Sequence, residues 1–517
     1  MHKLTETRRD FLKTIGLGAA SLALPGYARA AEPKGSRPNI ILIMADDLGY
    51  SDVGCYGGEI KTPNLDKLAQ GGMRFTQFYN CAKCSPTRAT LLTGQYDQAV
   101  GVQNMEHGAT FGEVLRAAGY RTLISGKWHQ KPLPTTRGFD RYFGLADGCC
   151  NFWNPGIKAR PGEGKPGRKI KGPRRWAIEG EAIMGYTPED KDFYTTDAFA
   201  DYAVARLQEY KSETKPFLLY LPQTAPHYPL HAWPEDIAKY RGKYKIGWDE
   251  LRRRRYERQI EIGMFDGKYA MSPRDEGVPS WDSLSDSKKD QADLRMAVYA
   301  AMVDRMDQAI GRVFDKVRQI GKWDNTLVLF LADNGGCPET PDTTPDIAPG
   351  PVEGYRCLGP AWANATNSPY RKFKSTDYEG GNCTPFIAYW PGVIEAGTRT
   401  DQVAHIIDIT PTFMELAGAS YPEQINGRKT KPVAGKSLLP VFQGKQRRGH
   451  EVLYWQFGKA KAVRAGKWKL VSLGQSGWEL YDLEEDRTEL NNLASQYPEK
   501  VEQMTALWDA WWKNCRG

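Results

Sequence analysis

The amino-acid sequence predicts an α/β fold: a large mixed, mostly parallel β-sheet sandwiched by helices, with a small C-terminal α+β domain that carries an antiparallel sheet. Over most of the chain, short apolar runs alternate with segments of helical periodicity, which is typical of parallel strands joined by helices. After about Gln446 the pattern changes to short, closely spaced strands. A chain of 517 residues also exceeds the usual length of one domain, which favours this division.

The elements of the larger domain are predicted in chain order from apolar runs and from helix start and stop signals. Residues 39–45 are expected to form a buried strand, and the next helix begins at Thr62-Pro63 and ends at Gly71-Gly72. Further strands are expected at residues 120–125, 217–221 and 326–332, and further helices at residues 111–118, 290–321 and 409–417. Two stretches rich in Gly and Pro are expected to be long loops, the first of them exposed: residues 154–175 and 336–361.

The smaller domain is predicted to cover residues 447–517. Its short antiparallel strands are expected at residues 452–457, 462–471 and 478–483. A helix at residues 499–513 follows them.

The N-terminal segment has the pattern of a twin-arginine export signal. The run from Thr7 to Lys13 contains Arg8-Arg9, an apolar stretch over residues 14–24 follows, and Ala28-Arg29-Ala30 ends the segment. Residues 1–30 are thus expected to be removed by cleavage, which leaves residues 31–446 as the larger domain. The apolar stretch is too short to span a bilayer, so we expect no stable membrane anchor. We expect the twin-arginine export machinery to deliver the chain to the periplasm of a bacterial cell, or to secrete it.

Composition and charge restrict the function classes. A hydrophobic content of 40% and a charged content of 26% are those of a soluble globular protein. The formal net charge of +8 is mild; it suits anionic substrates, and we expect no nucleic-acid partner. Nine cysteines are an odd number, so at least one is unpaired even if the others form disulfides, whose pairing the sequence does not determine.

Polar side chains follow four of the predicted strands. Asp46-Asp47 and Asp333-Asn334 come directly after two of them, Lys127 and His129 come after a third, and His227 lies a few residues beyond a fourth. Ligands of open α/β sheets bind at the carboxyl ends of the strands. We therefore expect these side chains to meet at one edge of the sheet.

Three carboxylates and an amide carbonyl at one edge require a cation. Two like charges about 4 Å apart repel by roughly 4 kcal/mol at the effective dielectric of a protein surface. Oxygen-only ligands suit Ca²⁺ or Mg²⁺ rather than zinc. We expect a single Ca²⁺ ion, because the chain is predicted to be exported.

The segment Cys84-Ser85-Pro86-Thr87-Arg88 opens a predicted short helix. Ser85 is expected to be its N-cap, Pro86 suits the first helical position, and Gly94 suits the end. This arrangement places Cys84 at the positive end of a helix, where backbone N–H groups favour an anion. Arg88, one turn later, faces the same position.

The Cys-x-Pro-x-Arg segment and its surroundings resemble the type I sulfatases of the arylsulfatase family, which have the alkaline-phosphatase-like fold. The resemblance extends from Pro38-Asn39 through Trp390-Pro391-Gly392 into the C-terminal domain. It departs from the common pattern at Thr87, where serine or alanine is more frequent, and at Gln95, where arginine is common. These departures remove no reactive group, so they concern specificity rather than class.

The resemblance implies a mechanism and a residue set. Cys84 corresponds to the residue that a formylglycine-generating enzyme or an anaerobic sulfatase-maturating enzyme oxidises to formylglycine (3-oxoalanine), the nucleophile that attacks sulfur. His227 is implied to protonate the leaving alcohol and His129 to take a proton, although from the residues alone these two roles could be exchanged. The implied catalytic positions are Cys84, Arg88, Lys127, His129, His227 and Lys374, and the implied ligands of the calcium ion are Asp46, Asp47, Cys84, Asp333 and Asn334.

The expected function is therefore hydrolysis of a sulfate ester, on a sulfated glycan or small molecule, to an alcohol and inorganic sulfate. One alternative is a phosphoryl-transfer hydrolase on the same fold, which commonly uses threonine or serine and two zinc ions. A second alternative is a non-catalytic carbohydrate-binding protein that keeps the fold. Cysteine at the nucleophile position and the complete set of ligands and basic residues favour the sulfatase.

A basic run between residues 151 and 175 follows a segment that leaves the sheet in the same region as Lys127 and His129, so we expect this run to reach the mouth of the pocket. Trp153 and Trp176 flank it, and Glu163 is its one acidic residue. One interpretation is a mobile, solvated surface loop without a substrate role. The alternative hypothesis is that the loop contacts flanking sulfate or carboxylate groups of a sulfated glycan while the two tryptophans stack on sugar rings. Its basic residues are Lys158, Arg160, Lys165, Arg168, Lys169, Lys171, Arg174 and Arg175.

Overall fold

The computed structural model describes residues 37–170, 172–474 and 476–516. The predicted export signal and its cleavage site after Ala30 lie outside these residues. In the described part of the chain, no helix is both long enough and apolar enough to cross a membrane.

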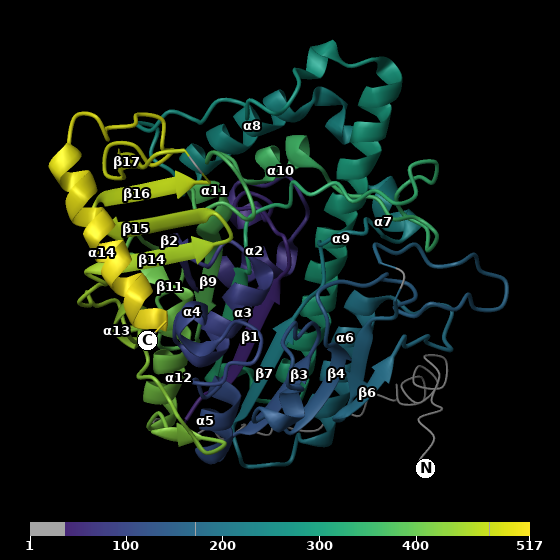
Figure 1. The fold of residues 1–517 in the computed structure, drawn as a ribbon. Helices are drawn as coiled ribbons and strands as arrows, with labels where there is room; N and C mark the ends of the chain where they lie inside the picture. Colours follow the sequence, from purple (N-terminus) through teal and green to yellow (C-terminus); the bar gives the residue numbers. More distant parts are fainter. Residues whose placement is uncertain (1–36, 171, 475, 517) are drawn as a thin grey trace, which may run out of the picture.

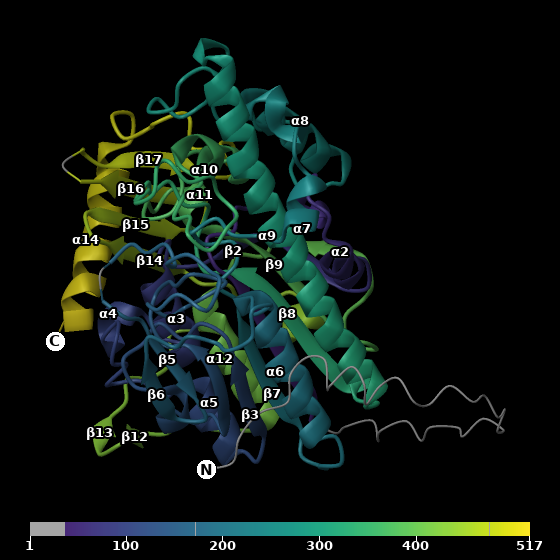
Figure 2. The same cartoon turned by 90° about the vertical axis from the view of Figure 1, so that its right-hand side faces the viewer.

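A large mixed sheet forms the centre of the molecule (Figures 1 and 2). Among the described residues it has eleven strands, with six parallel and four antiparallel pairings. The predicted mixed, mostly parallel sheet is thus confirmed. From edge to edge its strands are β10 (Thr398–Thr400), β2 (Met73–Tyr79), β9 (Cys383–Tyr389), β8 (Thr326–Ala332), β1 (Asn39–Ala45), β7 (Phe217–Pro222), β3 (Arg121–Ser125), β4 (Arg141–Leu145), β5 (Arg175–Ile178) and β6 (Glu181–Met184), with β11 (Ala404–His405) paired to β2.

Helices cover both faces of this sheet. Alternate side chains of β1 point into two separate hydrophobic cores, Ile41 and Ile43 into one and Ile40 and Leu42 into the other. The first core is covered by α2 (Pro63–Gln70), α6 (Thr195–Glu209) and α9 (Asp286–Gln319), and the second by α3 (Cys84–Thr93), α5 (Phe111–Ala117) and α12 (Ile409–Ala417). Figure 2 shows these two layers on either side of the sheet. Burial on both faces explains why β1 is apolar throughout.

A small antiparallel sheet follows near the C-terminus. It contains β14 (Val452–Phe457), β15 (Ala460–Ala465), β16 (Trp468–Leu473) and β17 (Glu479–Asp482), in that order. Helix α14 (Pro498–Arg516) covers its outer side (Figure 1), where the Trp508 indole donates to the Trp455 carbonyl at 3.0 Å. The predicted α+β region is thus confirmed, and the exact domain limits of 31–446 and 447–517 stay a prediction.

Shorter elements connect these layers. Two strands, β12 (Gln424–Ile425) and β13 (Arg428–Lys429), form a separate hairpin. Among the described residues, the other α-helices are α4 (Asp97–Val100), α7 (Pro234–Ala238), α8 (Trp248–Glu261), α10 (Pro360–Thr366), α11 (Glu379–Asn382) and α13 (Leu439–Phe442).

The expected single strand at residues 462–471 is wrong, because β15 and β16 form a hairpin there. Ala465 pairs with Trp468, so Gly466 and Lys467 make a two-residue turn. Gly466 has a φ of 58°, a conformation that glycine adopts without the steric cost of a side chain. The apolar residues on either side of this turn had the appearance of one continuous strand.

The loop of residues 154–175 is less exposed than expected. Asn154 is fully buried, and its side-chain oxygen accepts a hydrogen bond from Gly156 N at 3.0 Å. Arg160 is 5% exposed and pairs with Glu163. Trp176 lies in β5 with no exposed surface, packed between the rings of Tyr186 and Phe199. The expected stacking of Trp176 on a sugar ring is therefore wrong.

Candidate active site

Four strands that are neighbours in the sheet deliver the polar groups that the sequence predicted. Strands β8, β1, β7 and β3 lie side by side in this order and pair in parallel. Their carboxyl ends therefore meet at one edge of the sheet. The groups that follow them there are, in sheet order, Asp333-Asn334, Asp46-Asp47, His227 and Lys127-Trp128-His129.

Three buried ion pairs occupy this edge, and in each of them a lysine or arginine meets a carboxylate that follows a strand. The paired side chains are at most 1% exposed. Because removing charges from water is costly, three such pairs in one place point to a chemical role. The pairs are Lys127 Nζ with Asp46 Oδ2 at 2.5 Å, Arg88 Nη2 with Asp333 Oδ2 at 2.8 Å, and Lys374 Nζ with Asp47 Oδ1.

Cys84 is the first residue of α3 and is 5% exposed. The expected N-cap at Ser85 is wrong, because the Lys83 carbonyl already accepts the first helical hydrogen bond, from Thr87 N at 2.9 Å. Lys83 is therefore the N-cap, and no side chain caps this helix end. Gly94 ends the helix with a φ of 67°, as predicted. The start of α3 thus leaves backbone N–H groups beside Cys84.

Arg88 ties this helix to the strand ends. Its guanidinium donates to the Lys127 carbonyl at 2.8 Å as well as to Asp333. Burial alone would lower the pKa of Arg88, Lys127 and Lys374, but their carboxylate partners outweigh it, and Cys84 is among the nearby groups that interact with each of the three cations. All three cations are thus within electrostatic reach of Cys84 and stay charged at neutral pH.

The oxygen atoms at the centre of this edge fit a cation. Asp46 Oδ1, Asp47 Oδ2 and Asn334 Oδ1 are buried and have no hydrogen-bond partner among the described residues. Burial raises the pKa of Asp46 well above its usual range, and the nearby Asp333 carboxylate raises it further. A bound cation would supply both the missing partner for these oxygens and the charge that keeps the carboxylates ionised.

The structure adds a nitrogen to this set. Ligand atoms of Asp46, Asp47 and His227 all lie within 4.8 Å of one another, and His227 Nε2 is 3.5 Å from Asp47 Oδ2. His227 Nδ1 donates to the Tyr228 carbonyl at 2.6 Å, which leaves Nε2 facing the site. The prediction of oxygen-only ligands did not include His227. One carboxylate oxygen of Asp333 already accepts a hydrogen bond from Arg88.

His129 lies at the same edge in an unusual backbone conformation, with a φ of 59°. Its Nδ1 atom is buried and has no hydrogen-bond partner among the described residues. Burial, together with the charges of Lys127 and Arg88, holds the pKa of His129 well below its usual range. The imidazole is therefore neutral at neutral pH and can accept a proton.

Comparison with known proteins decides the family. The model of the sulfatase family matches residues 38–419. The chain belongs to the sulfatase family. A second model, described as the C-terminal part of N-sulphoglucosamine sulphohydrolase, matches residues 373–511 of this sulfatase.

The relatives of this sulfatase agree with that assignment. It is 33% identical to an uncharacterised sulfatase of Schizosaccharomyces pombe, over 93% of this chain and 94% of the relative. It is 32% identical to an arylsulfatase of Klebsiella aerogenes, over 83% of this chain and 97% of that protein. The crystal structure of Ps i-CgsB in complex with k-i-k-neocarrahexaose matches with a TM-score of 0.65 and 26% identity, over 93% of each chain. The predicted alkaline-phosphatase-like fold and sulfuric ester hydrolase activity are thus confirmed.

The structure brings every predicted site residue of this sulfatase to one edge of the sheet, and the roles assigned to them stay predictions. It also shows a group beside the site that the sequence did not suggest. Glu339 accepts a hydrogen bond from Tyr228 Oη at 2.6 Å and pairs with Lys83 at 2.7 Å. Lys83 precedes Cys84 and Tyr228 follows His227, so this cluster adjoins both. Lys83, Tyr228 and Glu339 are far apart in the sequence, and no motif indicates that they lie together.

Proposed function

We propose that this sulfatase hydrolyses a sulfate ester of a carbohydrate, with a formylglycine made from Cys84 and one bound Ca²⁺. The observation that carries the proposal is the start of α3, where Cys84 lies within electrostatic reach of three buried cations and at the edge that carries the unpartnered carboxylate oxygens. A carbohydrate as the substrate is supported by the similar protein crystallised with k-i-k-neocarrahexaose. A canine N-acetylgalactosamine-6-sulfatase, 26% identical over 89% of this chain, supports it as well.

The residues that would hold the calcium ion are Asp46, Asp47, Asp333 and Asn334, together with the side chain at position 84. Their oxygen atoms suit a hard cation, and Ca²⁺ tolerates irregular geometry. When bound, the ion supplies positive charge that polarises a sulfate oxygen and lowers the pKa of a coordinated hydroxyl. His227 Nε2 lies 3.5 Å from Asp47 Oδ2, and the proposal keeps this atom for proton transfer and assigns the ion to the oxygen ligands.

The three buried cations prepare the site for an anionic substrate. A formylglycine at position 84 supplies, as its hydrate, a hydroxyl nucleophile for sulfur. Arg88, Lys127 and Lys374 are held by carboxylates before substrate arrives, so they need not be reoriented to offset the charge of a sulfate group. Removal of one such donor typically costs about 100- to 1,000-fold in turnover.

Two histidines are available for proton transfer. We assign protonation of the leaving alcohol to the imidazolium form of His227, whose Nε2–H faces the site because Nδ1–H donates to the Tyr228 carbonyl. Burial lowers the pKa of His227, and the Asp47 carboxylate, 3.5 Å from Nε2, favours the charged form that the step requires. We assign the acceptance of a proton to His129, which is neutral and lacks a hydrogen-bond partner for its buried Nδ1 among the described residues. Positioned proton transfer of this kind contributes typically about 100- to 10,000-fold to a rate.

A comparison of sulfate and phosphate esters tests the proposal. The enzyme from its native host should release sulfate from a monosulfated sugar and from an aryl sulfate at least 100 times faster than it releases phosphate from the matching esters. The variant Cys84→Ala should lose this activity, whereas Cys81→Ala, which removes a buried thiol three residues away, should keep it. A preference for phosphate esters, or equal turnover by Cys84→Ala and the unchanged enzyme, would contradict the proposal.

We further propose that maturation and export precede this activity in the cell. Oxidation of Cys84 requires access to a residue that is 5% exposed in the folded chain, so modification before folding is favoured. Twin-arginine transport carries folded proteins, which orders the steps as modification, folding and export to the periplasm or beyond. A matured pool in the cytoplasm, detected when export is blocked, would agree with this order, and a fully exported pool with an intact thiol would contradict it.

A further inference from the structure

A buried tyrosine follows the histidine that is proposed to protonate the leaving alcohol. Tyr228 is 5% exposed, and its carbonyl oxygen accepts a hydrogen bond from His227 Nδ1 at 2.6 Å. The two rings also lie against each other, with their centroids 4.1 Å apart and their planes inclined by 44°. The position of the His227 imidazole therefore depends on where Tyr228 is held.

A carboxylate holds the far end of the Tyr228 side chain. The Tyr228 hydroxyl donates to Glu339 Oε2 at 2.6 Å. Burial and the Glu339 carboxylate raise the pKa of Tyr228, so the hydroxyl stays protonated and is available as a donor. A hydrogen bond from a hydroxyl to a carboxylate is charge-assisted and is stronger than one between neutral groups. Tyr228 is thus tied to Glu339 through its hydroxyl and to His227 through its carbonyl.

Two lysines hold Glu339 in turn. Lys83 Nζ lies 2.7 Å from Glu339 Oε1, and Lys169 Nζ lies 3.5 Å from Glu339 Oε2. Lys169 Nζ also donates to the Tyr228 hydroxyl at 2.9 Å. Burial alone would raise the pKa of Glu339, but the positive charges of Lys374 and Lys83 outweigh this and lower it to about 2. The carboxylate is therefore ionised at neutral pH.

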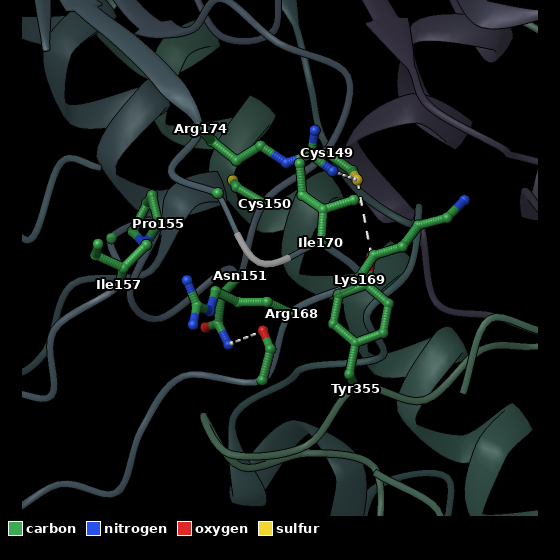
Figure 3. Close-up of a pocket in the computed structure, with 13 residues that line it drawn as sticks. Cys149, Cys150, Asn151, Pro155, Ile157, Arg168, Lys169, Ile170, Arg174 and Tyr355 are labelled. Carbon is green, nitrogen blue, oxygen red and sulfur yellow. Dashed lines mark hydrogen bonds between the residues drawn. The ribbon is translucent and has the colours of Figure 1, made fainter. Parts of the chain in front are cut away.

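Further contacts confine the Tyr228 ring. The ring of Tyr355 meets it edge to face, with centroids 5.9 Å apart, and Lys169 Nζ lies 5.3 Å from its centroid. Figure 3 shows Lys169 and Tyr355 among the residues that line one small hollow. Tyr228 and Tyr355 also belong to one small hydrophobic cluster, together with Cys337 and Cys357. Side chains packed in this way have little freedom to change rotamer.

Glu339 connects the parts of the catalytic edge. It follows Asn334 in the segment after β8, and two of its partners adjoin Cys84 and His227 in the sequence. The Glu339 side chain is 30% exposed and that of Lys83 is 22% exposed, and ion pairs open to water contribute little to stability. A role in the reaction therefore explains this cluster better than a role in folding.

We propose that Glu339 is a positioning residue for the reaction, which through Tyr228 holds the His227 imidazole where Nε2–H reaches the leaving alcohol. The inference rests on the sulfatase function proposed above. Glu339 transfers no proton itself and acts only through the hydrogen bond from Tyr228. Such an arrangement matters because a misplacement of about 1 Å can cost about 100-fold in rate.

The test measures kcat of four variants on two esters, a monosulfated sugar and an aryl sulfate with an acidic phenol. Tyr228→Phe removes the hydroxyl and keeps the ring. Glu339→Ala removes the acceptor, whereas Glu339→Gln keeps a carbonyl oxygen that can accept the same hydrogen bond. The fourth variant combines Tyr228→Phe with Glu339→Ala.

Two matched controls make the same chemical changes away from this cluster. Tyr194→Phe removes the hydroxyl of a fully buried tyrosine that donates to the His231 carbonyl at 2.8 Å. Glu213→Ala removes a carboxylate that is 31% exposed and pairs with Arg121 at 2.7 Å. All variants should melt within about 3 °C of the unchanged enzyme.

Tyr228→Phe and Glu339→Ala should each lower kcat on the sugar sulfate by about tenfold or more and change kcat on the aryl sulfate by less than about threefold, because only the sugar alcohol needs a proton to leave. Glu339→Gln should restore most of the loss. The combined variant should be no slower than Glu339→Ala, because both changes remove one hydrogen bond. The controls should leave both rates unchanged. Equal losses on the two esters, or losses that multiply in the combined variant, would overturn the inference.

A second measurement needs no turnover. The ring carbon resonance of His227 is observed by NMR in protein labelled with ¹³C-histidine and is assigned by its loss in His227→Asn. It should be single and sharp in the unchanged protein and in both controls. In Tyr228→Phe and Glu339→Ala it should broaden or split, because the imidazole then takes more than one position.

The two measurements separate this inference from the proposed function. If the unchanged protein hydrolyses neither ester and the His227 resonance still responds to Tyr228→Phe and Glu339→Ala, the proposed function fails and the positioning stands. If both esters are hydrolysed and neither variant changes the resonance or the ratio of the two rates, the function stands and the positioning is refuted.

Discussion

At the scale of single residues, each carboxylate of the catalytic edge has a cation from another part of the chain. Lys127 comes from the turn after β3, Arg88 from α3 and Lys374 from the segment before α11. Their residue types and positions were predictable, because acidic and basic groups directly follow apolar runs or belong to the motif. The pairing was not, since it depends on side-chain geometry in the folded chain. Neither was the contact of Glu339 with Lys83.

The division of proton transfer between the two histidines predicts a dependence on the leaving group. The variant His227→Ala should lose about 100-fold or more in kcat on a sugar sulfate, whose alcohol needs a proton to leave. It should lose less on an aryl sulfate with an acidic phenol, which leaves without one. His129→Ala should lose activity to the same extent on both substrates. The reverse pattern, measured by steady-state kinetics on the two esters, would exchange the roles.

Asp97 predicts how stability depends on pH. Burial raises the pKa of Asp97 to about 7 from the 3.8 of a solvent-exposed aspartate, so the folded state favours the neutral acid. The stabilising contribution of this group is thus complete at acid pH and is lost as the pH rises from about 4 to 7. Relative to Asp97→Asn, the native chain should lose up to ~4 kcal/mol of unfolding free energy between pH 4 and 8, measured by denaturant titration. A difference that does not change with pH would refute the shift.

At the scale of elements, the small sheet supports the segment that carries Lys374. Lys469 in β16 is fully buried and lies 2.8 Å from Glu379 in α11 and 2.9 Å from Glu489. Gly381, in the same short helix, accepts a hydrogen bond from Gly335 N at 3.0 Å, directly after Asn334. The C-terminal region thus supports both the segment of Lys374 and that of Asn334, a proposed metal ligand.

Loss of the buried lysine should therefore destabilise the molecule. Lys469→Met leaves two carboxylates buried without their shared cation, and we expect a loss of about 3–5 kcal/mol of unfolding free energy. Lys467→Met is the matched control, because Lys467 is 41% exposed and solvent screens its pair with Asp482, so that its loss should have little effect. Denaturant unfolding of both variants measures the difference. Equal effects would show that the buried network does not hold the two regions together.

At the scale of the whole molecule, the central sheet explains what the sequence could and could not predict. Strands β1, β7 and β8 are buried on both faces and therefore stand out as continuous apolar runs. Strands β2 and β6 have half-buried or exposed positions, and β5 has only four residues, so none stands out as such a run. The loop at residues 154–175 was predicted to be exposed because it is rich in Gly and Pro. This composition does not indicate that Asn154 and Arg160 are buried.

The proposed calcium ion should stabilise the whole fold as well as the reaction. Three buried oxygen atoms, on Asp46, Asp47 and Asn334, lack hydrogen-bond partners among the described residues. Exhaustive chelation should lower the melting temperature, and Ca²⁺ at 100 times its dissociation constant should restore about 2.7 kcal/mol of stability. Differential scanning calorimetry and elemental analysis measure this. A protein that contains no metal and is unaffected by chelation would refute the site.

The central claim is that Cys84 becomes the nucleophile of a sulfatase, and mass spectrometry of the Cys84 peptide from the native host tests it most directly. In active enzyme we expect the mass of the aldehyde or its hydrate at position 84, in proportion to specific activity across preparations. In the Cys84→Ala variant, the peptide that contains Cys81 and no other cysteine should keep an intact thiol. Fully active enzyme with an unmodified thiol at Cys84 throughout the population would contradict the account.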